Sequence, residues 1–227
     1  MFWDDQYKSQ ERIWGEGPSI LAVAALEYLR SHRPPGESFS ILDIGCGYGR
    51  DAFYLLDNCK CSVRGIDISK KAIEIASKTV VDNRKQGVEF ELRDFRELTQ
   101  NVYDIVFVSN LYQLLNKEGR NDLRQAAREA LKPGGLFFLS TLSVSDPEHR
   151  GKGVAIPGEP NSFQDRVYLH LCTKEELAED FAFLDIEELR EREYDEPRAT
   201  GETHHHISWI LIGKSSRGAP SKREDGG

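Results

Sequence analysis

The feature that most constrains the fold is the stretch SILDIGCGYGR at residues 40–50, where an apolar run ends in an acid and three alternating glycines follow. Residues 50–56 then have the pattern of an amphipathic helix. A strand, a glycine turn and a helix open a nucleotide-binding βα unit, because glycine adopts positive φ and lets the backbone approach a ligand with no Cβ in the way. The stretch therefore predicts a ligand site where this strand ends.

The spacing of the glycines distinguishes a dinucleotide-binding site from other sites built on a glycine turn. A dinucleotide fingerprint, G-x-G-x-x-G, would need its third glycine where this chain has Arg50, and here that glycine comes one residue earlier, at Gly49. The spacing therefore disfavours a nicotinamide-dependent dehydrogenase.

Strand-like and helix-like patterns alternate along most of the chain. Helical patterns are expected at about 18–31, 49–57, 70–85 and 119–131, with a short helix from 173. Strands are expected at about 39–45, 62–67, 88–92, 104–109, 136–141, 184–192 and 204–212, with a turn at 132–135. This alternation predicts βαβ units and an α/β fold built on a mostly parallel sheet.

At 227 residues the chain is long enough for a single α/β domain, expected at 1–214. Residues 1–37 are expected to form an N-terminal helical cap, 143–171 an irregular insertion on the substrate side, and 215–227 a disordered tail. Residues 1–17 are rich in aromatic side chains, so we expect either a helix packed on the domain edge or a lid, with Trp14 as its hinge or wall.

Composition excludes several classes of function. The net charge of -8 argues against a nucleic-acid partner, which would require a basic stripe. Charged residues make up 30% of the chain and no apolar run is long enough to span a bilayer. The N-terminus lacks the features of a signal peptide, so a cytoplasmic location is expected. The four cysteines are expected as free thiols, and their spacing predicts no metal site.

Acids end three successive predicted strands: Asp43, Asp67 and Asp94. The carboxyl ends of parallel strands meet at one edge of the sheet, so these carboxylates could converge on one ligand. Asp67 would accept hydrogen bonds from vicinal ribose hydroxyls, and Asp94 from an adenine amino group. The alternative is that each acid only terminates its strand as a turn or cap residue.

Between residues 42 and 135 the sequence resembles the class I S-adenosylmethionine-dependent methyltransferases. The resemblance rests on LDIGCGYGR at 42–50, GIDIS at 65–69, RDF at 93–95, YDIV at 103–106 and LKPGG at 131–135, in the order of the family's motifs. It implies a Rossmann-like fold with a seven-stranded, mostly parallel sheet, helices on both faces and the last strand antiparallel. The implied cofactor is S-adenosylmethionine, with S-adenosylhomocysteine as product.

The resemblance also implies roles for single residues. Asp67 would hold the cofactor ribose, Ile68 would pack on the adenine, and Asp94 and Phe95 would frame the adenine edge. The remaining residues implied to contact the cofactor, at the glycine turn and the methionine end, are Asp43, Gly45, Cys46, Gly47 and Asn110, with Trp14 as a wall of the site.

The histidine run at 204–206 supplies the catalytic candidates. In a strand, His204 and His206 share one face and His205 lies on the other. The pair could remove a proton from the acceptor, bind a metal, or only begin the strand. A metal is not predicted, because no cysteine or acid nearby clearly completes a site. GETHHH at 201–206 also resembles the tellurite-resistance subgroup weakly, with Thr203 and His205 departing from its pattern.

The leading interpretation is an enzyme that moves a methyl group to a small-molecule acceptor, with a thiol or another chalcogen as one candidate nucleophile. The sulfonium methyl is already activated, so positioning and desolvation account for most of the catalysis and no obvious triad is needed. The alternatives are a protein side-chain methyltransferase and a non-catalytic cofactor-binding module. A monomer or homodimer is expected.

The 143–171 segment contains charged and polar residues that could meet an anionic substrate: Arg150, Arg166, Tyr168 and His170.

Overall fold

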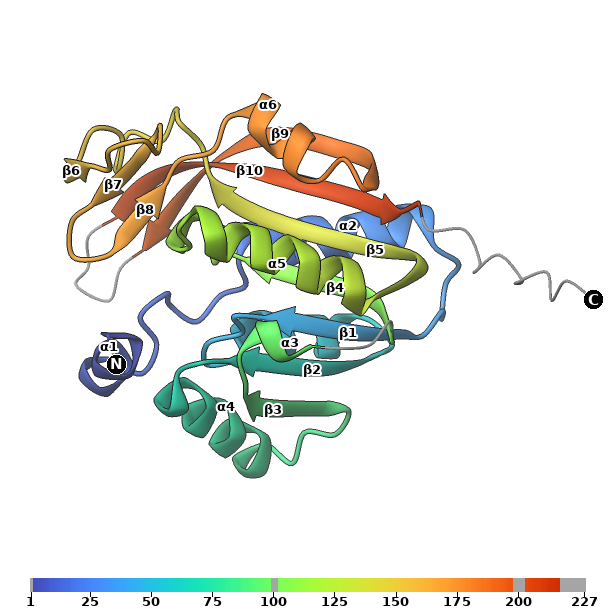
Figure 1. Cartoon of the computed structure of the whole chain (residues 1–227). Helices are drawn as coiled ribbons and strands as arrows, with labels where there is room; N and C mark the ends of the chain where they lie inside the picture. The colour runs from blue at the N-terminus through green and yellow to red at the C-terminus, as the bar shows by residue number, and fades with distance from the viewer. Residues whose placement is uncertain (1, 99–101, 198–202, 217–227) are drawn as a thin grey trace, which may run out of the picture.

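The computed structural model describes residues 2–98, 102–197 and 203–216. Its main feature is a seven-stranded sheet with the strand order β3-β2-β1-β4-β5-β10-β9 (Figure 1). Every neighbouring pair from β3 to β5 is parallel, whereas β10 is antiparallel to both of its neighbours. This arrangement confirms the α/β fold, the seven-stranded sheet and the antiparallel last strand.

The elements alternate as the sequence patterns predict. The strands of the large sheet are β1 (Phe39–Ile44), β2 (Cys61–Asp67), β3 (Val88–Leu92), β4 (Tyr103–Ser109), β5 (Leu131–Leu142), β9 (Leu184–Pro197) and β10 (Thr203–Ser215). The helices are α1 (Phe2–Ser9), α2 (Ile20–His32), α3 (Arg50–Asn58), α4 (Lys70–Asp82), α5 (Lys117–Ala130) and α6 (Lys174–Asp180), with short 3-10 turns η1 (Phe95–Glu97) and η2 (Tyr112–Leu114).

Polar side chains fix where four of the helices begin. Ser19, Ser69, Asn116 and Thr173 each accept a hydrogen bond from a backbone N–H in the first turn of the helix that follows. Such caps satisfy donors that the helix itself leaves unpaired and are worth about 1 kcal/mol each.

The core lies on both faces of the large sheet. Along β4, Ile105 and Phe107 pack with α2 and α3 on one face, while Val106 and Val108 pack with α5 and α6 on the other. All four side chains are buried, as expected for a central parallel strand. Helices therefore cover both faces and leave the strand ends to form a site.

The segment expected to be irregular between 143 and 171 instead contains a second, antiparallel sheet. Its strands are β6 (Val154–Ala155), β7 (Ser162–Gln164) and β8 (Tyr168–His170). Figure 1 shows this small sheet and α1 at the same end of the large sheet, the end where β1 and β3 finish. The strands are too short to give a clear period in the sequence, so the sequence did not predict this sheet.

Two boundaries also differ from expectation. Residues 132–135, expected as a turn, belong to β5, where they form an irregularity as the pairing changes from Tyr103–Leu131 to Ile105–Leu136. Gly134 has φ +72°, so the segment keeps turn-like backbone geometry inside the strand. β10 extends to Ser215, and 217–227 of the predicted tail lie outside the described residues. No helix in the described part of the chain is long and apolar enough to cross a membrane.

Candidate cofactor site

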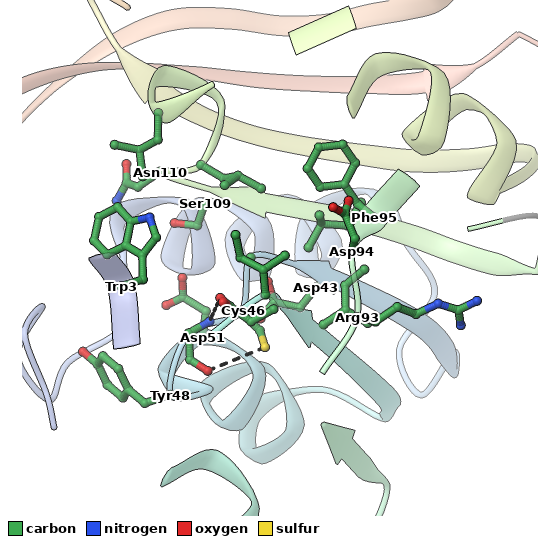
Figure 2. A pocket seen from close by; sticks show the side chains of 18 of the residues that line it. Trp3, Asp43, Cys46, Tyr48, Asp51, Arg93, Asp94, Phe95, Ser109 and Asn110 are labelled. Carbon is green, nitrogen blue, oxygen red and sulfur yellow. Dashed lines mark hydrogen bonds between the residues drawn. The ribbon is translucent and has the colours of Figure 1, made fainter. Parts of the chain in front are cut away.

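A pocket opens at the carboxyl ends of β1, β2 and β4 (Figure 2). Figure 2 shows Trp3 and Asn110 on one side of it and Asp94 and Phe95 on the opposite side, with Asp43 and Cys46 between them. The pocket is lined by every residue for which cofactor contact was predicted: Trp14, Asp43, Gly45, Cys46, Gly47, Asp67, Ile68, Asp94, Phe95 and Asn110. The structure therefore brings the predicted residues together from five separate parts of the chain.

The glycine turn forms one wall of the pocket. Gly45, Gly47 and Gly49 all have positive φ, at +75°, +54° and +83°. Gly49 is the N-cap of α3, so the turn leads directly into that helix. A side chain at Gly45 would also come within 3.0 Å of Leu111. These positions require glycine both for the backbone conformation and for space.

Asp67, at the end of β2, is held by the backbone around it. Its Oδ2 accepts a hydrogen bond from the N–H of Gly47 at 2.9 Å, and its Oδ1 accepts one from the N–H of Ser69 at 2.8 Å. Burial raises the pKa of Asp67 and the backbone N–H groups oppose that rise. The carboxylate therefore joins the glycine turn to the start of α4 and has a fixed orientation in the pocket.

The N-terminal segment is docked on the pocket. The hydroxyl of Tyr48 donates to the carbonyl of Gly15 at 2.6 Å, and the guanidinium of Arg50 donates to the carbonyl of Trp14. In α1, Asp4 accepts from the Ser69 hydroxyl at 2.7 Å. The segment is thus tied to both α3 and α4, with Trp3, Tyr7 and Trp14 turned to the pocket.

Carboxylates dominate the electrostatics of the pocket. Asp43 is buried, and its Oδ2 has no hydrogen-bond partner among the described residues. Burial, together with the neighbouring Asp51 and Asp67, raises the pKa of Asp43 well above its usual range. Burial also works against the charge of Arg50, but Asp51, Tyr48 and Glu196 together outweigh burial and raise the pKa of that guanidinium. At the glycine-turn end of the pocket, Asp43, Asp51 and Asp67 outnumber the single arginine, Arg50. This end suits a positively charged ligand group, which would stabilise the carboxylate form of Asp43.

The adenine-sized part of the pocket away from the glycine turn combines apolar side chains with polar ones on both of its sides. Ile68 is 43% exposed and lines the pocket, whereas Phe95 is buried against the core. Asp94 caps η1 by accepting from the N–H of Arg96 at 3.0 Å. Asn110 has φ +54°, and its N–H donates to the carbonyl of Ser140 at 3.1 Å. A flat apolar ligand group could pack on Ile68 while polar atoms meet Asp94 and Asn110.

The histidines of β10 lie beside this pocket and do not line it. His206 is buried, with its Nδ1 3.1 Å from Oδ2 of Asp146 and its Nε2 3.8 Å from Oε2 of Glu196. His204 is partly exposed, with its Nδ1 3.9 Å from Oε2 of Glu148. The two rings share one face of the strand, as predicted. The expectation that no acid lies near them is wrong, since Asp146 of the insertion contacts His206 directly.

Two residues of the pocket were missed by the sequence analysis, and two residues of the insertion make other contacts than expected. Trp3 and Tyr7 line the pocket, and their only signal was the density of aromatic residues in 1–17. Tyr168 and His170, expected to meet a substrate, instead hydrogen-bond within the protein. His170 contacts the hydroxyl of Ser162 through Nδ1 at 2.8 Å and Glu176 through Nε2 at 2.6 Å. This buried network fastens the small sheet to α6.

Comparisons with known proteins agree with the architecture. Residues 41–135 match the protein family described as "Methyltransferase domain". Phosphoethanolamine N-methyltransferase of Plasmodium falciparum is 27% identical over 151 residues, which are 65% of this chain and 56% of that protein. The chain covers 44%, 56% and 29% of the length of the first three curated relatives that it matches.

Solved structures share the fold over nearly the whole chain. A structure titled for the conversion of a disulfide bond into a thioacetal group during echinomycin biosynthesis has a TM-score of 0.72 at 22% identity, covering 96% of this chain and 92% of that chain. TehB from Haemophilus influenzae has a TM-score of 0.64 at 17% identity, and the match covers 94% of this chain and 67% of that chain. Residues 41–135 are thus a methyltransferase domain, and the strand order and the similar relatives support a class I S-adenosylmethionine-dependent methyltransferase.

Proposed function

We propose that this chain transfers the sulfonium methyl group of S-adenosylmethionine to a small-molecule acceptor. The observation that carries the proposal is the pocket itself, in which Asp67 is bonded to the glycine turn and the carboxylates of Asp43 and Asp51 lie nearby. S-adenosylmethionine carries a positive sulfonium and a positive ammonium, so an acidic pocket suits its methionine end. The apolar side chain of Ile68 suits its adenine.

The comparisons support a small acceptor. The relative from Plasmodium falciparum is named for phosphoethanolamine, and the structural neighbour from echinomycin biosynthesis is titled for chemistry at sulfur. A thiol or another chalcogen acceptor stays our first candidate class. Predictions of a cytoplasmic location, of a monomer or homodimer, and of no nucleic-acid substrate accompany this proposal.

The chemistry is an in-line displacement. A lone pair of the acceptor attacks the methyl carbon, and the bond from that carbon to the sulfonium breaks with its electron pair passing to sulfur, which releases S-adenosylhomocysteine. A thiol acceptor loses its proton before or during attack. His204 and His206 are the candidates to receive that proton, since histidine is the usual base near neutral pH. Of the two, His204 has the greater access to solvent.

Purified chain and methyl-labelled S-adenosylmethionine test the proposal. The label should appear on members of a panel of thiols, selenols and phosphorylated amines, with competition by S-adenosylhomocysteine. Cofactor binding without label on any acceptor would favour a non-catalytic module, and label on a protein from cell extract would favour a protein substrate. If His204→Ala and His206→Ala both keep full turnover, neither histidine is the base.

A further inference from the structure

Asp146, His149 and His206 form a compact cluster outside the cofactor pocket. Asp146 and His149 come from the segment that follows β5, and His206 comes from β10. One Asp146 oxygen lies 2.9 Å from Nδ1 of His149, and the other lies 3.1 Å from Nδ1 of His206. The two imidazole rings are nearly parallel, at 16°, with their centroids 5.3 Å apart.

We propose that Asp146, His149 and His206 bind a divalent transition-metal ion. Two imidazole nitrogens and one carboxylate oxygen are a ligand set that suits first-row divalent ions such as Zn²⁺, Fe²⁺ and Co²⁺. Their ligand atoms all lie within 4.8 Å of one another. Bonds of about 2.1 Å place neighbouring ligand atoms about 3.0 Å apart around an octahedral ion and about 3.4 Å apart around a tetrahedral one. The separations between Asp146 and the two histidines, 2.9 and 3.1 Å, are close to these values.

The backbone holds the carboxylate in place for this role. Asp146 is fully buried, and its Oδ1 accepts from the N–H of His149 at 2.9 Å while its Oδ2 accepts from the N–H of Ile207 at 2.9 Å. A carboxylate oxygen has two lone pairs, so each keeps one that faces an imidazole. Both oxygens are therefore oriented without using up their capacity to bind an ion.

The outer contacts of His206 fit the same role. Its Nδ1 faces Asp146, and its other ring nitrogen, Nε2, faces the carboxylate of Glu196. Histidines that bind metals usually direct their second ring nitrogen to a carboxylate or carbonyl, which fixes the ring and its tautomer. Glu148, beside His204, adds a further negative charge nearby. The surroundings of the cluster thus favour a cation.

A second cluster of side chains that could hold a metal consists of His170, Cys172 and Glu176, and it differs from the first. In His170, both ring nitrogens are within hydrogen-bond distance of other side chains, Ser162 and Glu176, as described above. Its hydrogen bonds thus occupy both nitrogens of one ring. In the first cluster only Nδ1 of each histidine is hydrogen-bonded to Asp146, and an ion would replace these two bonds. His149 differs because it is partly exposed, with 27% of its side chain accessible, which gives an ion a route to the site.

An ion bound here would fasten the segment after β5 to β10. The test uses the full chain after treatment with a chelator, titrated with Co²⁺ and followed by its visible absorption, with Zn²⁺ binding measured by equilibrium dialysis. The wild type should bind one ion per chain. His149→Ala should weaken binding by at least about 100-fold, because even outer partners of metal ligands are worth 10- to 100-fold. Zn²⁺ should also raise the thermal midpoint of the wild type and leave that of His149→Ala unchanged.

The matched control is His205→Ala. His205 neighbours His206 in β10 but is exposed on the other face, with a carboxylate of its own, Asp195, 3.0 Å away. This variant should bind Co²⁺ as the wild type does. Equal binding by the wild type and His149→Ala, or equal weakening by both variants, would overturn the proposal and leave a hydrogen-bonded cluster. Neither measurement uses the methyl donor, so the outcome is independent of the proposed methyl transfer.

Discussion

Tyr7 lies directly over Gly47: a Cβ added at Gly47 would come within 2.6 Å of the Tyr7 hydroxyl. Tyr7 is buried in α1, and Gly47 is the central glycine of the turn that follows β1. The contact explains why the N-terminal helix belongs to the cofactor site. It closes the pocket above the glycine turn.

Gly47→Ala should weaken binding of S-adenosylhomocysteine by about tenfold. The substitution forces alanine to adopt a φ of +54°, which costs about 1–2 kcal/mol, and it pushes Tyr7 away from the turn. Isothermal titration calorimetry measures the effect. Gly17→Ala is the control, since a Cβ there would meet nothing within 4 Å and the affinity should stay unchanged.

Asp67→Asn should weaken cofactor binding by about ten- to 100-fold, the range for losing hydrogen bonds to a charged group. The amide cannot accept from both the Gly47 and Ser69 N–H groups through two oxygens, so the turn also loses a contact. Equilibrium binding of S-adenosylhomocysteine checks this. Asp57→Asn, which alters an exposed pair with Lys85, should bind normally, and equal losses in both variants would contradict the assigned role of Asp67.

Asp104 should make stability depend on pH. Burial would raise the pKa of Asp104, but its bonds to Lys132 and Ser40 outweigh burial and lower it. A carboxyl whose pKa is lowered by folding stabilises the protein above its unfolded pKa of about 3.9 and loses that contribution as pH falls further.

Asp104→Asn should therefore lower the thermal midpoint by about 2–4 °C at pH 7, the shift expected for about 1 kcal/mol in a chain of this size. The difference from the wild type should shrink as the pH falls below 4. Thermal denaturation monitored by circular dichroism over a pH series would reveal it. A difference that is constant with pH would show that ionisation of Asp104 is not responsible.

The cofactor site was largely predictable because its residues follow strands. Asp67 and Asp94 come at the ends of strands whose apolar patterns are clear, and the parallel sheet brings such ends to one edge. Residues 132–135 have the composition of a turn, but the pairing of β5 with β4 keeps them in the strand. Composition describes the local backbone and contains no information about the partner strand.

Contacts made across the chain were not predictable in the same way. Asp146 reaches His206 over 60 positions, from a segment that has no period to indicate which side chains face the sheet. The spacing of Asp146 and His149 is a weak signal that matches many surface turns. Tyr7 is similar, because one short helix rich in aromatic residues does not reveal which residue faces a glycine turn 40 positions later.

Asp4 holds α1 against the start of α4. Oδ1 of Asp4 accepts from the Ser69 hydroxyl at 2.7 Å and from the N–H of Lys71 at 3.0 Å, and these bonds lower the pKa of Asp4. Asp4→Ala removes both and should loosen α1, while the cap that Ser69 provides to α4 remains. Because α1 contributes Trp3 and Tyr7 to the pocket, bound S-adenosylhomocysteine should dissociate several-fold faster.

Hydrogen exchange should show weaker protection of 2–9 in Asp4→Ala, and stopped-flow displacement should show the faster dissociation. Asp5→Ala is the matched control, since Asp5 makes an exposed pair with Lys8 in the same helix and should behave as the wild type. Faster exchange in α1 with an unchanged dissociation rate would mean that the helix covers the pocket without retaining the ligand. Unchanged exchange would mean that the aromatic contacts of Trp3 and Tyr7, rather than Asp4, hold α1 in place.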